Sequence, residues 1–414
     1  MDVRSAGRRR AAFAAAALLL ALIVALVASE LAVRVAKRFV CVGRGVGLYA
    51  PHRSLGWAPR PGAEGWQYGC YDRRFEFRTY VRINSLGLRD HEIALGAPAD
   101  TLRVLLLGDS ITEAVQVELE QTFAKLIERE LDSRHRRVEV INAGVAAYGT
   151  DNALKFYRER ARQLGADLVV LMFNLQNDVA ENHPELFERL YGSEVLHLAL
   201  VKAEANVGDD GEVRFETDAL ARHVDSLDLD ERGRPGGFGE RVRRMSYVAR
   251  TLSRWLEGPP GGVPLETAVP VNFWIYQTPP DAMWEEAWQR TAAFVHALRR
   301  EVEADGTRFA AAIIPAKDMV DERWWKMMEL RAEPAEGSRW ELESPRRRAL
   351  GLFESAGVDV FDLTAPMRER QRQRKSSLFF TVDVHLTPLG HQTVAEALAP
   401  VIQARLAERS GPAR

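Results

Sequence analysis

The 414-residue sequence lacks a surplus of either charge. It has 56 Lys and Arg against 58 Asp and Glu, which leaves a formal net charge of −2. Binding along a nucleic-acid backbone needs a basic surface, so we do not expect nucleic acid as a partner. The sequence also lacks internal repeats, and its 46% hydrophobic content excludes a wholly disordered chain. At roughly 100–200 residues per domain, the length allows one large domain with insertions or two smaller ones.

Only one long hydrophobic run is present, near the N-terminus. Residues 11–29 (AAFAAAALLLALIVALVAS) contain no charge, and as a helix at about 1.5 Å per residue they span roughly the 30 Å hydrocarbon core of a bilayer. The run is long for a signal peptide and apolar residues continue beyond Glu30, which favours an uncleaved single-pass anchor. A cleaved signal peptide with a weak site at Val27 and Ser29 is the alternative. Glu30 and Arg34 are four residues apart and can form an ion pair.

The sequence has little cysteine. Its two cysteines, Cys41 and Cys70, both follow the hydrophobic run. In an oxidising compartment a disulfide between them would close a loop of about 30 residues and stabilise the fold by about 3 kcal/mol in the chain-entropy model. Two unpaired thiols are the alternative, because spacing does not fix pairing. Basic residues flank the run on both sides and give the positive-inside rule little direction. We expect a cytoplasmic-membrane protein whose body lies outside the cytoplasm, periplasmic or extracellular.

Five short apolar runs predict a buried parallel sheet. They occupy residues 103–108, 138–144, 167–173, 308–315 and 358–363. Continuous apolar runs of this length are typical of strands that are covered on both faces. Helical patterns separate these runs, so a doubly wound α/β fold is predicted. Ligands of such sheets bind beyond the carboxyl ends of the strands.

The sequence predicts three parts along the chain. A tail and anchor occupy residues 1–36, a membrane-proximal extension residues 37–100, and the α/β domain residues 101–409. A long insertion at about 181–265 interrupts this domain. Within it, residues 203–240 are polar and rich in glycine, which predicts little core structure.

Four polar blocks follow predicted strands or lie near the C-terminus. They are GDSIT (108–112), VINAGVAAYGTDN (140–152), NLQNDV (174–179) and VDVHLTPLGH (382–391). In the first block, Ser110 comes just past the carboxyl end of a strand and opens a helix, which exposes its hydroxyl at the site-forming edge of the sheet. Alone this signal is weak, because Asp and Ser are also common helix N-caps.

Together the four blocks resemble those of the SGNH, or GDSL-type, ester hydrolases. The segment NSLGLRD (Asn84–Asp90) ahead of the first block resembles the membrane-anchored bacterial branch of that family. The resemblance implies a flavodoxin-like three-layer α/β/α sandwich with a central parallel sheet of about five strands. It also implies hydrolysis or transfer of acyl esters without a cofactor.

The resemblance also assigns roles to individual residues. Ser110 is the nucleophile, His385 the general base, and Asp383 the carboxylate that orients the imidazole. The backbone N–H groups of Ser110 and Ala147 and the side-chain amide of Asn177 are the oxyanion donors. Simpler readings stay open, namely a loop histidine, a turn-forming aspartate and a helix-capping asparagine.

The sequence departs from the family pattern in three places. Ala147 and Leu175 stand where the family usually has glycine. A positive φ would strain alanine, and Leu175 would narrow an acyl pocket. Only Val384 separates Asp383 from His385, where two residues are the commonest spacing. The shorter spacing resembles envelope polysaccharide O-acetyltransferases related to the family.

Other candidate residues are interpreted as structural. A zinc site built from Asp383, His385 and His391 would lack a fourth ligand nearby, so no metal is expected. His391 follows the N-cap residue Thr387 in a predicted helix and is expected to pack in the core. The basic run 368–375 (RERQRQRK) predicts a solvated helical face, with contact to an anionic polymer or headgroup as the alternative. Six tryptophans between the blocks are expected to fill the core, with sugar stacking as the alternative; they are Trp274, Trp284, Trp288, Trp324, Trp325 and Trp340.

The sequence therefore predicts a membrane-anchored serine ester hydrolase. It would act through an acyl-enzyme on O-acyl groups, with O-acetyl favoured, of an envelope or exported polysaccharide. An O-acetyltransferase that uses the same residues with a sugar hydroxyl as acceptor is one alternative. A catalytically degenerate binding module with the same fold is the other, because two family glycines are replaced.

Overall fold

The computed structural model describes residues 3–39, 47–71, 74–132, 137–198, 201–208, 211–227, 270–373 and 376–408, together with 242, 246, 248 and 249. The chain divides into two compact units. The smaller comprises Met1–Val42, Cys70–Phe75 and Asp228–Gly262, and the larger comprises Gly43–Gly69, Glu76–Leu227 and Val263–Arg414. Most of the extension predicted at 37–100 thus falls in the same unit as the α/β sheet.

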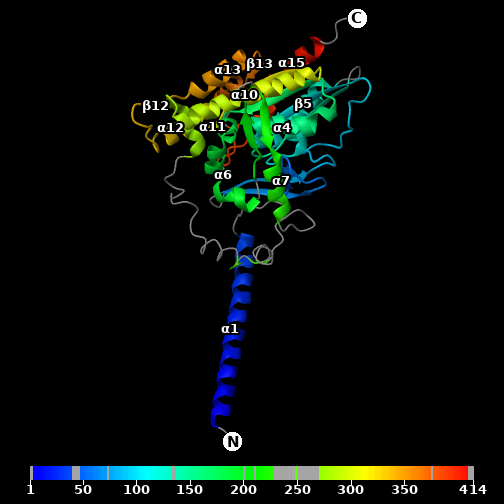
Figure 1. Ribbon diagram of the computed structural model, residues 1–414. Helices are drawn as coiled ribbons and strands as arrows, with labels where there is room; N and C mark the ends of the chain where they lie inside the picture. The colour runs from blue at the N-terminus through cyan, green and yellow to red at the C-terminus, as the bar shows by residue number, and fades with distance from the viewer. Residues whose placement is uncertain are drawn as a thin grey trace. The chain divides into compact units, whose positions relative to one another are not determined.

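A five-stranded sheet lies at the centre of the larger unit (Figure 1). In spatial order its strands are β13 (Asp359–Asp362), β11 (Arg308–Ile314), β7 (Leu168–Asn174), β5 (Thr101–Gly108) and β6 (Arg137–Gly144). Every neighbouring pair is parallel. All five apolar runs predicted as strands are therefore confirmed, as is the α/β class.

The order of the strands reverses direction at β5. From β5 the chain first adds β6 on one side, and then adds β7, β11 and β13 in turn on the other side. In doubly wound sheets the ligand crevice forms at the carboxyl ends of the strands where this reversal occurs. The topology thus points to the residues that follow β5, β6 and β7.

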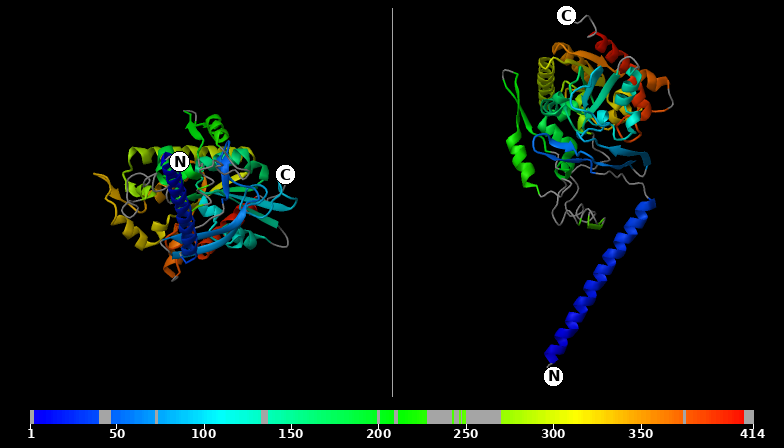
Figure 2. Two further views of the ribbon diagram at one scale, coloured as in Figure 1. Left: turned by 90° about the horizontal axis from the view of Figure 1, so that it is seen from below. Right: turned by 90° about the vertical axis from the view of Figure 1, so that its right-hand side faces the viewer.

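Helices cover both faces of the sheet and bury its apolar side chains in two clusters. The first cluster includes residues of α4 (Thr150–Glu159), α10 (Ala282–Ala304) and α13 (Ser344–Ser355). The second includes residues of α3 (Phe123–Leu131), α14 (Thr364–Gln373) and α15 (Pro388–Ala407). The three-layer α/β/α arrangement is confirmed, and the two views of Figure 2 show the helices around the sheet.

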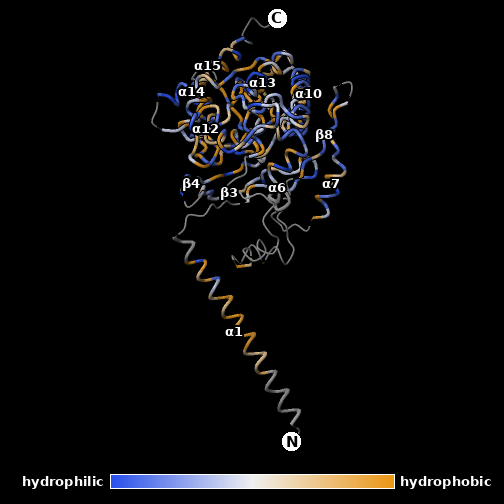
Figure 3. Tube along the Cα trace, turned by 90° about the vertical axis from the view of Figure 1, so that its left-hand side faces the viewer, coloured by the Kyte–Doolittle hydropathy of each residue, from blue (hydrophilic) through white to orange (hydrophobic). Residues whose placement is uncertain are grey.

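The helix α1 (Val3–Phe39) belongs to the smaller unit and contains the apolar run. The segment Phe13–Val35 is long and apolar enough to cross a membrane, and its apolar stretch is not buried against the rest of the protein. Figure 3 shows this continuous hydrophobic stretch. The predicted ion pair is confirmed, because Arg34 Nε lies 2.8 Å from Glu30 Oε1.

Two two-stranded ribbons precede the sheet. The first pairs β1 (Tyr49–His52) with β2 (Gly56–Pro59), and the second pairs β3 (Glu64–Tyr71) with β4 (Arg74–Arg82). Cys70, at the end of β3, is disulfide-bonded, and Cys41, the other half of the expected pair, lies outside the described residues.

The predicted insertion contains more structure than its composition suggests. After α6 (Pro184–Leu198), strands β8 (Glu204–Val207) and β9 (Val213–Glu216) form a hairpin, and α7 (Thr217–Ser226) follows. Their buried residues form a small core of Ala203, Leu220 and Val224. The expectation of little core structure at 203–240 is therefore wrong for the part up to residue 227. Figure 2 shows this hairpin and helix, in green, at the periphery of the larger unit.

Candidate active site

Ser110 lies at the point where the sheet topology predicts a ligand crevice. It is the first residue of the short helix α2 (Ser110–Glu113), directly after β5, and Asp109 is the N-cap. The strand ends Gly108 and Gly144 are paired neighbours. A Cβ at Gly144 would lie 2.3 Å from the Glu113 nitrogen, and one at Gly108 would lie 2.3 Å from Thr112 Oγ1. Glycine at both positions therefore lets the α2 turn sit directly on the strand ends.

The structure brings together the three side chains predicted as a triad. His385 Nε2 lies 2.8 Å from Ser110 Oγ, although the residues are 275 positions apart in the chain. His385 Nδ1 is hydrogen-bonded to Asp383 Oδ1. The same oxygen accepts the backbone N–H of His385 at 2.8 Å. This is the geometry that a serine nucleophile, its base and an orienting carboxylate require.

Two charged residues hold the loop that carries Asp383 and His385. On one side Lys317, in α11 (Lys317–Val320), donates from Nζ to the carbonyl oxygens of Phe380 and Thr381 at 2.7 and 2.9 Å. On the other side Glu76 of β4 accepts the N–H groups of Val382 and Asp383 at 2.7 and 2.8 Å. The loop backbone is thus fixed from both its carbonyl and its amide groups.

The surroundings of His385 favour its protonated form. Burial opposes the imidazolium, but the charge and hydrogen bond of Asp383 outweigh it, with smaller contributions from the carboxylates of Asp109 and Glu113. Together these carboxylates raise the pKa of His385 above its usual value. Burial lowers the pKa of Lys317 to about 8, although nearby carboxylates oppose the shift.

Ala147 adopts the left-handed conformation that the sequence analysis identified as strained, with φ of +62°. Its neighbour Ala146 is held on both sides. The Ala146 N–H donates to Glu113 Oε2 at 2.9 Å, and its carbonyl accepts from Trp57 Nε1 at 3.0 Å. Because a trans peptide places C=O and N–H on opposite sides, the Ala147 N–H points away from Trp57. No acceptor within the described residues engages this N–H, so it is available as an oxyanion donor.

Asn177 sits at the N-cap of α5 (Asp178–Glu181) and its amide faces carboxylates. Its Nδ2 donates to Asp109 Oδ2 at 2.9 Å and to Glu181 Oε1 at 3.3 Å. Asn174 Nδ2 donates to the same Asp109 oxygen at 2.7 Å. In this structure, therefore, both hydrogens of the Asn177 amide are directed to carboxylates. The bond to Glu181 is the longer of the two and the weaker.

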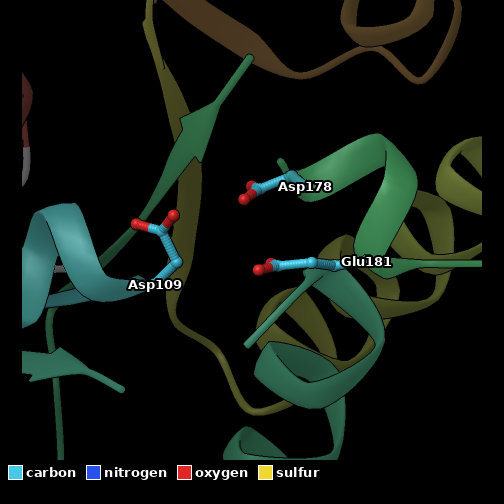
Figure 4. Close-up of side chains that lie close together, drawn as sticks. All are labelled: Asp109, Asp178 and Glu181. Carbon is cyan, nitrogen blue, oxygen red and sulfur yellow. The ribbon is translucent and has the colours of Figure 1, made fainter. Parts of the chain in front are cut away.

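Three buried carboxylates form this cluster, namely Asp109, Asp178 and Glu181 (Figure 4). One oxygen of each lies within 4.8 Å of the others. Burial raises the pKa of all three groups, and the neighbouring charges raise those of Asp178 and Glu181 further, with Glu181 reaching about 7. Because Asp109 already accepts N–H groups from Asn174, Asn177 and Ile111, its carboxylate acts as an anchor for these amides.

Asp109 and Asp178 hold local backbone amides, and the expectation that His391 packs in the core is confirmed. Asp109 accepts the Ile111 N–H and Asp178 accepts the Asn174 N–H. His391 is 1% exposed, accepts the Phe123 N–H at 3.3 Å, and has its pKa lowered to about 3 by burial and the charges of Arg89 and His385. Of the six tryptophans expected to fill the core, Trp284 and Trp288 are buried in the first cluster, and Trp274, Trp325 and Trp340 pack against it. Trp324 is half-buried, and Lys317 Nζ lies 3.8 Å from the centroid of its ring.

Leu175 is buried in the first core cluster. Its N–H donates to the Ile314 carbonyl at 3.0 Å, which ties the end of β7 to β11.

Sequence reasoning missed several residues that support the site. Arg89 is 1% exposed, and its guanidinium donates to three backbone carbonyl oxygens near α2, those of Glu113, Ala114 and Val117. Asp90 is also buried and pairs with Lys125 at 2.7 Å. Both belong to the NSLGLRD segment, so the motif itself was the signal. Lys317 and Glu76 lie in no motif, and no signal in the sequence marked them.

Comparison with known proteins gives three findings. A family model described as the SGNH hydrolase-like domain of acetyltransferase AlgX matches residues 273–414. The curated "Probable alginate O-acetylase AlgJ" of Pseudomonas aeruginosa is 29% identical over 170 residues, which are 40% of this chain and 39% of that protein. This chain thus spans about two fifths of that relative's length.

The match of the family model supports the resemblance to the SGNH-type family over residues 273–414. Solved structures with similar folds include an acetyl xylan esterase, AlAXEase, and a lipase/acylhydrolase from Enterococcus faecalis. Each is 12% identical with a TM-score of 0.36 and covers 73% of this chain, and the similarity spans 100% and 96% of the two structures. The residues that the family model matches include the block with Asp383 and His385, whereas the block with Ser110 lies outside them.

We predict that Ala147→Gly stabilises the protein. The left-handed conformation costs an L-residue about 1–2 kcal/mol, whereas glycine costs about 0.4–1 kcal/mol through the entropy of the unfolded chain. The free energy of unfolding should therefore rise by about 0.5–1 kcal/mol in denaturant titrations. Ala146→Gly, next to it with no positive φ, is the matched control and should lower the stability. A loss of equal size in both variants would contradict the strain at Ala147.

Proposed function

We propose that this protein is a serine enzyme that transfers O-acetyl groups to or from a polysaccharide through an acyl-enzyme. The observation that carries the proposal is the hydrogen-bonded series Asp383, His385 and Ser110 at the carboxyl end of β5. The match to an acetyltransferase domain model and to an alginate O-acetylase supports acetyl transfer to a sugar hydroxyl. Hydrolysis, the function expected first from the sequence, uses the same side chains with water as the acceptor.

The first half of the proposed reaction acetylates Ser110. As its Oγ attacks the carbonyl carbon of an acetyl ester, its proton passes to His385 Nε2, 2.8 Å away. The carbonyl oxygen becomes an oxyanion that accepts from the N–H groups of Ser110 and Ala147. When the tetrahedral intermediate collapses, the proton moves from His385 to the leaving oxygen, and the acetyl group stays on Ser110.

The second half of the reaction returns Ser110 to its free form. His385, again neutral, accepts the proton of a sugar hydroxyl or of water as that oxygen attacks the acetyl carbonyl. Collapse of the intermediate breaks the bond to Ser110 and returns the proton to its Oγ. Asn177 becomes the third oxyanion donor in both halves when its 3.3 Å contact with Glu181 gives way to the stronger acceptor.

The site is proposed to lie outside the cytoplasm, on a body anchored by α1. The apolar span Phe13–Val35 and the disulfide-bonded Cys70 support this location, because disulfides form and persist in oxidising compartments.

We predict that Ser110→Ala lowers acetyl transfer by about 10⁴-fold. The assay uses the full-length protein in detergent micelles with an acetyl ester donor, with and without an oligosaccharide acceptor, and mass spectrometry of the products. Ser226→Ala, at an exposed helix end, is the matched control and should keep full activity. Acetylated oligosaccharide supports transfer, and free acetate alone supports hydrolysis. Equal rates for Ser110→Ala and the native protein would overturn the serine mechanism, and an inactive native protein would favour a binding module.

The activity is expected to depend on pH through His385. The base must be neutral to accept the proton, so kcat/KM should rise with pH to a plateau. The midpoint of this rise should lie above 6.5, because the carboxylates raise the pKa of the His385 imidazole. Asp383→Asn removes the negative charge that stabilises the imidazolium of His385 most, so the midpoint of the kcat/KM profile should move to lower pH. The plateau of kcat/KM should fall by roughly 10³–10⁴-fold. A midpoint that stays in place in this variant would exclude His385 as the titrating base.

The location can be tested with reporter fusions at the C-terminus. Alkaline phosphatase should be active and green fluorescent protein dark, because the former folds only outside the cytoplasm and the latter only inside. The purified protein should also keep residues 1–29 in its intact mass if α1 is an uncleaved anchor. Bright green fluorescence would contradict the proposed topology.

A further inference from the structure

The ribbon of β3 and β4 has aromatic side chains on a solvent-exposed face. Trp66 is 42% exposed and Tyr80 is 37% exposed. Their ring centroids lie 5.2 Å apart in an edge-to-face arrangement, and Tyr68 lies 6.4 Å from Trp66. Such side chains are usually buried, and a cluster of them in solvent marks a binding surface more often than an isolated one does.

A cation lies on this aromatic face. The Arg78 guanidinium carbon is 3.9 Å from the centroid of the Trp66 ring and 5.8 Å from that of Tyr68. Within the described residues no carboxylate pairs with Arg78, whereas Arg82 on the same strand pairs with Glu64 at 2.9 Å. The contact with the ring orients the planar guanidinium, whose N–H groups suit a carboxylate.

The same strand reaches the proposed catalytic loop. Glu76, two residues before Arg78, accepts the N–H groups of Val382 and Asp383. Phe77 packs against Phe380, with ring centroids 5.4 Å apart. At about 3.4 Å per residue, Arg78 and Tyr80 lie roughly 7 and 14 Å along β4 from Glu76. The aromatic face therefore begins beside the loop of His385 and leads away from it over a distance of several bonded sugar rings.

We propose that Trp66, Tyr68, Arg78 and Tyr80 form a subsite for an acidic polysaccharide, which we term the ribbon subsite. Sugar rings present apolar C–H faces that pack on aromatic rings, and a uronate carboxylate complements the unpaired guanidinium of Arg78. The inference rests on the proposed function and adds to it the place on the β3–β4 ribbon where the polymer is held. The subsite would hold the polymer while one residue of it lies at Ser110.

A lipid surface is the competing occupant, because exposed aromatic and basic side chains also occur at membrane interfaces. The contacts between β4 and the Asp383 loop favour the polysaccharide, since they connect the face directly to the site of acetyl transfer. Vesicle binding is therefore one outcome of the test.

The test compares binding with catalysis in the full-length protein in detergent micelles. Calorimetry measures the affinity for an oligouronate of about eight sugars, and 4-nitrophenyl acetate reports on Ser110 without the polymer. Trp66→Ala and Arg78→Ala should each weaken oligouronate binding by about tenfold or more, with turnover of the small ester unchanged within about twofold. Arg78→Lys keeps the charge but loses the planar stack, so its affinity should fall in between.

Leu330→Ala is the control, because Leu330 is an exposed apolar residue outside the ribbon at 89% exposure. It should leave both measurements unchanged, and Tyr80→Ser gives a second variant if Trp66→Ala folds poorly by circular dichroism. Oligouronate affinity that does not change in the ribbon variants overturns the subsite. The subsite is also overturned if the native protein binds phosphatidylglycerol vesicles but not oligouronate, and if Trp66→Ala abolishes the vesicle binding. Oligouronate binding without any ester turnover would instead retain the subsite and reject the proposed function.

Discussion

The geometry of the candidate site depends on the fixation of one short loop by two opposite charges. Ser110 is fixed by the sheet, but His385 lies 275 residues later in the chain. Its 2.8 Å contact with the serine therefore requires that the loop carrying His385 keeps its position. Lys317 holds the carbonyl groups of this loop and Glu76 holds its amide groups. Since Glu76 belongs to β4, the ribbon that precedes the sheet also helps to shape the site.

Much of the fold could be predicted from the sequence because its signals are local. A strand covered on both faces must be apolar throughout, so β5 and β7 are visible as uninterrupted runs. Ser110 could be placed because it follows such a run, and His391 because it follows a recognisable helix start at Thr387. The β8–β9 hairpin was missed because its strands are four residues long and largely polar, and they pack only a small core.

The supporting residues could not be predicted, for a different reason. Lys317 and Glu76 bind backbone carbonyl and amide groups, which nearly every residue has, so the choice of partner leaves no pattern in the sequence. The orientation of Asn177 shows the same limit. Its identity suggested an oxyanion donor, but the buried carboxylates of Asp109 and Glu181 that receive its hydrogens become neighbours only in the folded chain. Ala147 is the opposite case, because the motif marked a position where a positive φ would strain alanine, and the backbone there has a φ of +62°.

The buried ammonium of Lys317 also links loop geometry to the proton balance of folding. Its folded pKa of about 8 lies below the value near 10.4 of an exposed lysine. Between these two values the unfolded chain binds a proton at this position that the folded chain does not, so this group makes folding more favourable as the pH rises through that window. Below pH 8 both states are charged, and the folded protein keeps a desolvated cation inside. The loop is thus held in place at a cost to global stability that an apolar side chain at position 317 would not incur.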